Sequence, residues 1–139
     1  MQNDTDMKAL FEGFDPQQYA QETQQRWGHT EHYKESQRRT ARYTAQDWQR
    51  YREENAALMQ ALLAAQRSGR AATSTETLAL AEQHRLSIDR WFYPCSHEMH
   101  VRLADMYASD ERFAQNIDAF GPGLTAYLVA AIRGNAAGA

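Results

Sequence analysis

The chain has 139 residues and a net charge of −3, with 15 lysines and arginines set against 18 aspartates and glutamates. Basic and acidic residues are interleaved, which argues against nucleic-acid binding by this chain itself, and the single cysteine excludes an internal disulfide. No apolar run approaches the length of a membrane span, so we expect one cytoplasmic domain with one core.

Helix-forming residues dominate the chain, whereas valine and isoleucine together number only five. We therefore predict an all-α fold. Thr44 with Asp47 has the spacing of a capping box, and Thr73, Ser96 and Ser109 are expected to cap the later helices. The expected helices cover residues 16–27, 30–43, 44–67, 73–92, 96–107, 110–119 and 124–134.

The apolar composition changes near residue 57. Residues 11–57 contain no Ile, Leu, Val or Met, yet they hold eight of the fifteen aromatic residues. Helices without an aliphatic stripe are marginal alone, so residues 14–43 should gain order by docking aromatics onto the core or onto a ligand, and both alternatives stay open. From residue 58 onward, aliphatic residues at helical spacing predict a packed core of Leu58, Leu62, Leu63, Leu78, Ile88, Leu103, Met106, Ile117, Leu124, Leu128 and Ile132.

Cys95 follows Tyr93-Pro94, which interrupts a helical pattern, and precedes Ser96, a residue suited to a helix cap. A thiol at a helix N-terminus is favoured as thiolate by the free backbone N–H groups and the helix dipole. Trp91, Phe92, Tyr93 and Met99 would supply an apolar wall beside it. The pattern predicts a nucleophile beside an apolar cleft; the alternative is a small buried hydrophobic residue.

The histidines near Cys95 raise two further questions. His84 shares a helical register with Ile88, and His100 with Leu103, so both are expected on apolar faces as hydrogen-bonded groups. A ligand set with metal-binding spacing is missing, so no metal or other cofactor is expected. No orienting residue or oxyanion motif accompanies Cys95, so we expect no enzyme. The arginines of residues 38–52 are expected to form a solvated face.

Short motifs spread over nearly the whole chain resemble a known family. They include Phe14-Asp15-Pro16, Arg26-Trp27-Gly28-His29-Thr30, Asp47-Trp48-Gln49-Arg50, His84-Arg85, Glu98-Met99-His100, Met106-Tyr107, Ser109-Asp110-Glu111-Arg112-Phe113, Asn116-Ile117-Asp118 and Pro122-Gly123-Leu124. Their order and spacing are similar to the TipAS antibiotic-recognition domain, the C-terminal effector domain of MerR-family, thiostrepton-induced transcriptional activators.

This resemblance implies a globin-like helical fold without haem, whose N-terminal helices form a mobile lid over a thiopeptide-binding cleft. In thiopeptide-binding members a cysteine before Glu-Met-His adds to a dehydroalanine of the drug, and this position corresponds to Cys95. Residues 1–13 would end a linker from a MerR-type DNA-binding part, residues 14–139 would form the domain, and the full-length protein would be a homodimer that contacts DNA only through that other part.

The resulting hypothesis is a non-enzymatic domain that senses thiopeptide-like, hydrophobic antibiotics. Its alternative is a stress-sensing or protein-interaction module without a drug ligand. The candidate ligand-binding residues are Cys95, Trp27, Tyr33, Trp48, His84, Trp91, Tyr93, Met99, His100 and Tyr107.

Overall fold

The computed structural model describes residues 31–139, which form six helices and, within that range, no strand. The helices are α3 (Glu31–Thr40), α4 (Ala45–Arg67), α5 (Thr75–Trp91), α6 (His97–Ser109), α7 (Glu111–Asp118) and α8 (Leu124–Ala137). The predicted all-α class is confirmed. None of these helices is long and apolar enough to cross a membrane. The linker expected over residues 1–13 and the helix expected over 16–27 lie outside the described residues.

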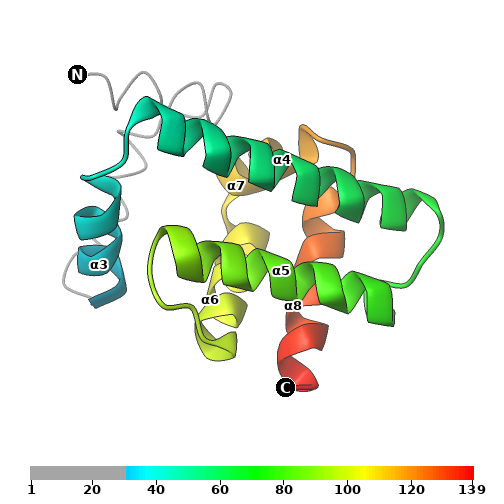
Figure 1. Ribbon diagram of the computed structural model, residues 1–139. Coiled ribbons are helices and arrows are strands. Elements are labelled where there is room, and N and C mark those ends of the chain that lie inside the picture. The colour runs from blue at the N-terminus through cyan, green and yellow to red at the C-terminus, as the bar shows by residue number, and fades with distance from the viewer. Residues whose placement is uncertain (1–30) are drawn as a thin grey trace.

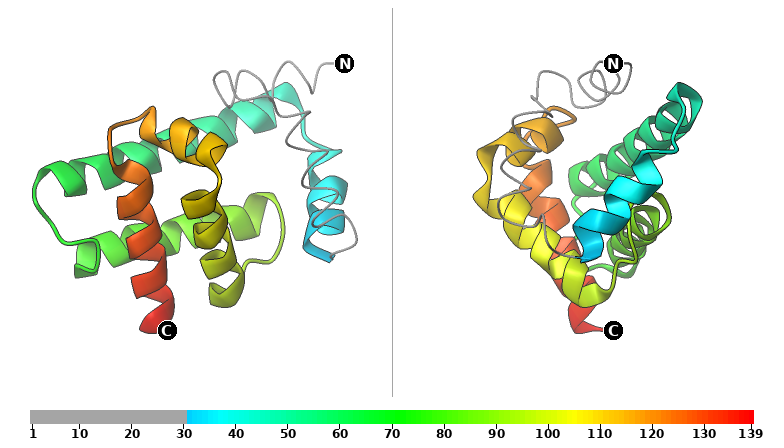
Figure 2. Two further views of the ribbon diagram at one scale, coloured as in Figure 1. Left: turned by 180° about the vertical axis from the view of Figure 1, so that it is seen from behind. Right: turned by 90° about the vertical axis from the view of Figure 1, so that its left-hand side faces the viewer.

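The helices form two crossing layers (Figures 1 and 2). The long helices α4 and α5 run antiparallel, joined by a short turn, and α6 and α8 cross behind them as a second pair. The short helix α7 connects α6 to α8 and contacts both. Helix α3 lies apart from this body, at the end where α4 begins and α5 ends. It contacts α5 and contains no fully buried residue.

Several helix boundaries follow from the capping residues that the sequence predicts. The Thr44 side chain accepts a hydrogen bond from Asp47 N at 3.2 Å, and Asp47 Oδ2 accepts one from Thr44 N at 3.0 Å, so the capping box is confirmed. Ser96 Oγ accepts from Met99 N at 3.1 Å, as expected for the cap of α6. Helix α4 ends at Arg67, as expected.

Two predicted caps are wrong by one residue. Helix α5 is capped by Ser74 rather than Thr73, and α7 by Asp110 rather than Ser109. In both pairs the neighbouring residues are comparable caps, and it is the second one that accepts the cap hydrogen bond, Ser74 from Thr77 N and Asp110 from Arg112 N. Ser109 instead ends α6, where its hydroxyl donates to Met106 O at 3.3 Å. The outer helices also differ, since α3 stops at Thr40 and α8 continues three residues past Gly134.

The core lies between the two layers. Of the predicted core residues, all are buried except Leu78 and Met106, which are partly buried. Leu62, Leu124, Leu128 and Ile132 have no exposed surface. The main cluster contains Leu58, Met59, Leu62, Leu63, Ala104, Ile117, Leu124, Leu128, Val129 and Ile132.

The turn from α7 to α8 passes close to α4 at Gly121. A Cβ atom added there would lie 2.3 Å from Leu63 Cδ1 and 3.2 Å from Leu63 Cγ, so the whole buried Leu63 side chain would have to move. We predict that Gly121→Ala lowers the free energy of unfolding by about 1–3 kcal/mol. Gly138→Ala is the control, because its nearest new contact is 3.8 Å away. Urea denaturation measures both, and equal stabilities would contradict the prediction.

Candidate functional site

Cys95 lies in a small apolar cluster between the end of α5 and the start of α6. It packs with Ile88, Met99 and Leu103, all buried. Partly buried Phe92, Tyr93, Met106 and Tyr107 cover these four side chains. We call these eight residues the thiol cluster. Phe92, Tyr93 and Met99 thus lie beside Cys95 as expected, Tyr107 joins them, and Trp91, expected in the same wall, is not part of this cluster.

The predicted thiolate at Cys95 is wrong for this structure. Cys95 precedes the cap residue Ser96, and the sulfur is buried, with the residue 1% exposed. Burial raises the pKa of the Cys95 thiol to about 12, and the nearby Arg85 guanidinium offsets only part of that rise. The group is therefore a protonated thiol at neutral pH, whose sulfur lies 3.8 Å from Ser96 O.

A second cluster of rings lies beside the first. Tyr51 is central in it, with its ring centroid 5.0 Å from Phe92, 6.0 Å from Trp91 and 6.4 Å from Trp48. Tyr43 adds edge contacts to Trp48 at 5.4 Å and Trp91 at 5.5 Å. We call these five residues the aromatic cluster, and Phe92 belongs to both clusters.

Trp48 and Trp91 were candidates from the sequence, whereas Tyr43, Tyr51 and Phe92 were not. The signal that could have identified Tyr43 and Tyr51 is the concentration of rings before residue 57, which does not say which rings meet, whereas Phe92 was expected only in the apolar wall beside Cys95. Trp48 is 7% exposed, and its indole N–H finds no hydrogen-bond partner in the described part of the chain. The aromatic cluster thus contains a buried donor that a ligand acceptor could use.

His84 and His100 form a buried pair that joins α5 to α6. His84 Nδ1 lies 2.8 Å from His100 Nε2, and the two rings stack with centroids 5.1 Å apart. Burial lowers the pKa of His84 to about 4, and burial together with the neighbouring His84 lowers that of His100 to about 3. Both are neutral near pH 7, as expected for core histidines. His100 Nδ1 has no hydrogen-bond partner among residues 31–139.

Helix α3 is held to the end of α5 by polar contacts. Arg39 Nη1 donates to the carbonyls of Asp89 at 2.6 Å and Arg90 at 3.3 Å, and the Tyr43 hydroxyl donates to Trp91 O. These carbonyls belong to the last turn of α5, where a cation is favourable. The expectation that Arg39 belongs to a solvated face is therefore wrong.

Two further candidate residues come from the N-terminal part of the chain. Tyr33 lies half-buried on α3, and Trp27 lies outside the described residues. His32 of α3 meets Tyr93 of the thiol cluster edge-on, with ring centroids 5.2 Å apart. Helix α3 therefore contacts the thiol cluster.

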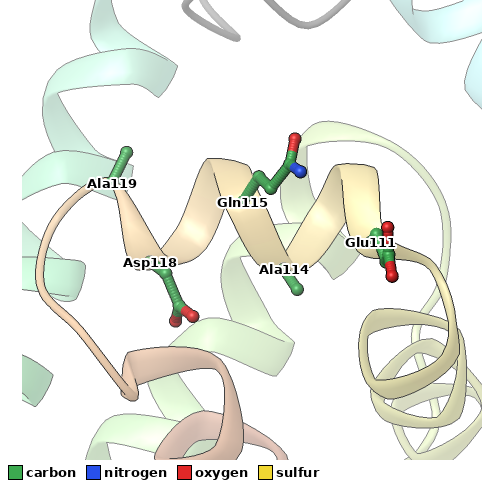
Figure 3. A pocket seen from close by; sticks show the side chains of 5 residues that line it. All are labelled: Glu111, Ala114, Gln115, Asp118 and Ala119. Atoms are coloured by element: carbon green, nitrogen blue, oxygen red, sulfur yellow. The ribbon is translucent and has the colours of Figure 1, made fainter.

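Two surface hollows among the described residues lie elsewhere. One, of about 540 Å³, is lined by residues of α7 and the position after it, Glu111, Ala114, Gln115, Asp118 and Ala119 (Figure 3). The other, of about 240 Å³, lies between α4 and α5. Neither is lined by Cys95 or by a ring of the aromatic cluster. Within residues 31–139, no group of three or more His, Cys, Asp or Glu residues could hold a metal ion.

The described residues thus form an all-helical domain with a buried thiol beside a cluster of rings. Residues 19–135 match the family model of the TipAS antibiotic-recognition domain, and the chain belongs to this family. Its structure also matches that of TipAS from Streptomyces lividans in complex with nosiheptide, with a TM-score of 0.89, 45% identity, and coverage of 94% of this chain and 92% of that one. The globin-like fold expected from the resemblance is thereby confirmed.

Other relatives place the family among transcriptional regulators. The HTH-type transcriptional activator TipA of Streptomyces coelicolor is 46% identical over 127 residues, or 91% of this chain and 50% of the relative. The regulator SkgA of Caulobacter vibrioides is 32% identical over 142 residues, covering 96% of this chain and 54% of the relative. The chain thus spans about half the length of these relatives.

The buried histidine pair predicts a pH dependence of stability. Between pH 6.5 and about pH 4 the unfolded chain takes up a proton at each histidine while the folded chain keeps both neutral. The free energy of unfolding should therefore fall with falling pH, by up to about 1.4 kcal/mol per pH unit for each histidine. His100→Gln keeps a polar partner for His84 and should reduce this slope. Urea denaturation at several pH values tests it, and an unchanged slope would count against the neutral pair.

The α3 contact gives a second prediction, with a matched control. Arg38 and Arg39 both bind Glu35, but only Arg39 also reaches the α5 carbonyls. Arg39→Gln should speed amide exchange in α3 at least about tenfold, because hydrogen bonds from charged donors stabilise by about 1.5–3 kcal/mol. Arg38→Gln should change it little. Equal exchange rates in the two variants would show that Arg39 does not hold the helix.

Proposed function

We propose that this domain binds thiopeptide-like, hydrophobic antibiotics over the aromatic and thiol clusters, beneath the N-terminal helices, and that it is a binding domain rather than an enzyme. The observation that carries the proposal is the match, at 45% identity over nearly the whole chain, to TipAS with nosiheptide bound. The domain would act in the cytoplasm.

The aromatic cluster supports the reversible part of binding. Its rings would offer rigid apolar surface to the rings of such an antibiotic, and the Trp48 N–H, which has no hydrogen-bond partner among residues 31–139, would offer a donor to a carbonyl or a ring nitrogen. Helix α3, which rests on polar contacts at the end of α5, can open and close over this region at modest cost. Tyr33, Trp27, His84 and His100 remain candidate contacts in this proposal.

Cys95 supports a covalent second step. The thiol would add across the C=C bond of a dehydroalanine, so that an S–Cβ bond forms, the π bond breaks, and the thiol proton ends on the antibiotic Cα. No group leaves, and the mass gain equals the whole antibiotic. Because the thiol is buried and protonated in this structure, binding must come first and change its surroundings before the bond forms.

In a regulator of the TipA kind, we infer that this domain reports binding to an HTH part outside these 139 residues. DNA contact and a homodimeric state would both belong to that longer protein, with residues 1–13 as the end of the connecting linker. This inference is supported by the named function of the relatives, of which the chain spans about half.

The covalent step predicts that Cys95→Ala separates reversible binding, which it keeps, from adduct formation, which it loses. This variant should still bind thiostrepton, less than about tenfold more weakly, because the rings that supply reversible affinity are unchanged. It should form no adduct. Tryptophan fluorescence during titration measures binding, and intact mass after denaturation measures the bond.

The same measurements separate the alternatives. An adduct that persists in Cys95→Ala would place the chemistry on another residue. Tight binding without an adduct on the wild type would show recognition without a bond. No binding of any thiopeptide would favour the stress-sensing or protein-interaction module.

A further inference from the structure

Cys95 is held at its backbone by two side chains of α5. Asp89 Oδ1 accepts a hydrogen bond from Cys95 N at 2.8 Å, and Arg85 Nη1 donates one to Cys95 O at 2.7 Å. Arg85 and Asp89 are four residues apart and therefore share one face of the helix. Cys95 itself lies between two helices, so these side chains supply the backbone contacts that a regular helix would otherwise provide.

The Arg85 side chain is itself held in place by Glu82. Arg85 makes two hydrogen bonds to Glu82, at 2.9 and 2.5 Å, and Glu82 also accepts one from Asn135 of α8 at 2.9 Å. The hydrogen bond from Arg85 lowers the pKa of Glu82 to about 2, so Glu82 stays charged at neutral pH. A series of hydrogen bonds thus runs from Asn135 of α8 through Glu82 and Arg85 of α5 to the backbone carbonyl of Cys95.

We propose that Asp89 and Arg85 are positioning residues that aim the Cys95 sulfur at the electrophilic carbon of the bound antibiotic. This inference rests on the proposed covalent capture. Bond formation needs the sulfur about 3–3.5 Å from that carbon, and a shift of about 1 Å can slow such a step about a hundredfold. Fixing both polar groups of the Cys95 backbone limits where the sulfur can move.

Two variants of Asp89 distinguish a positioning role of its side chain from an effect of its negative charge. Asp89→Ala removes the acceptor for Cys95 N–H, whereas Asp89→Asn keeps an acceptor oxygen and removes only the negative charge. That charge disfavours a thiolate at Cys95, so its loss alone should not slow the reaction. If the carboxylate acts by holding the backbone, alanine should impair the step and asparagine should rescue it.

The experiment follows adduct formation by intact mass at saturating thiostrepton, with reversible binding measured separately in the Cys95→Ala background. Asp89→Ala should slow bond formation by about ten- to a hundredfold while reversible binding changes less than about threefold. Asp89→Asn should react within about threefold of the wild type. Asp105→Ala is the control, because it removes a carboxylate from an exposed ion pair on α6 with Arg133.

A second measurement needs no antibiotic. Amide exchange at Cys95 should be slow in the wild type and in Asp89→Asn, and fast in Asp89→Ala. An Asp89→Ala variant that forms the adduct at the wild-type rate would overturn the positioning role and leave covalent capture intact. An Asp89→Asn variant as slow as Asp89→Ala would show that an acceptor oxygen at this position is not sufficient and would also overturn the positioning role. A wild type without adduct would overturn covalent capture itself and positioning with it, even where amide exchange confirms the hydrogen bond.

Discussion

The last turn of α5 holds two neighbouring segments in place, helix α3 and the loop that contains Cys95. Its terminal carbonyls lack helical partners, and Arg39 and Tyr43 fill that role from the α3 side. From the same turn, Asp89 reaches forward to the loop that contains Cys95. Helix α3 and the loop that contains Cys95 therefore share one support, which is fixed by the packing of α5 against α4 and α8.

Features determined by neighbouring residues were predictable from the sequence. The Thr44 capping box and the leucines of the core follow from spacing alone, because a helix places residues three and four apart on one face. Ser74 and Asp110 were missed by one position because each stands beside another suitable cap. Arg39 was misassigned because its partners lie 50 and 51 residues away, where no local pattern can indicate them.

Cys95 shows the same limit for chemistry. A helix N-terminus in the sequence indicates a stabilised thiolate, but the protonation state depends on how deeply the side chain is buried, and burial is a tertiary property. The buried histidine pair was placed correctly on apolar faces, yet its hydrogen bond between α5 and α6 could not be foreseen. Such a bond specifies how two helices pack, because a shifted register would leave both rings without a partner.

The burial of Cys95 also affects how fast its thiol can be oxidised. Peroxide and glutathione disulfide react with exposed thiolates, and a protonated sulfur with 1% of its residue exposed offers them neither charge nor access. Sulfenic acid and mixed disulfides should therefore form slowly at this position, and oxidative stress alone would leave the sulfur intact. For the covalent step proposed above, a thiol protected in this way would stay available while its surroundings become oxidising.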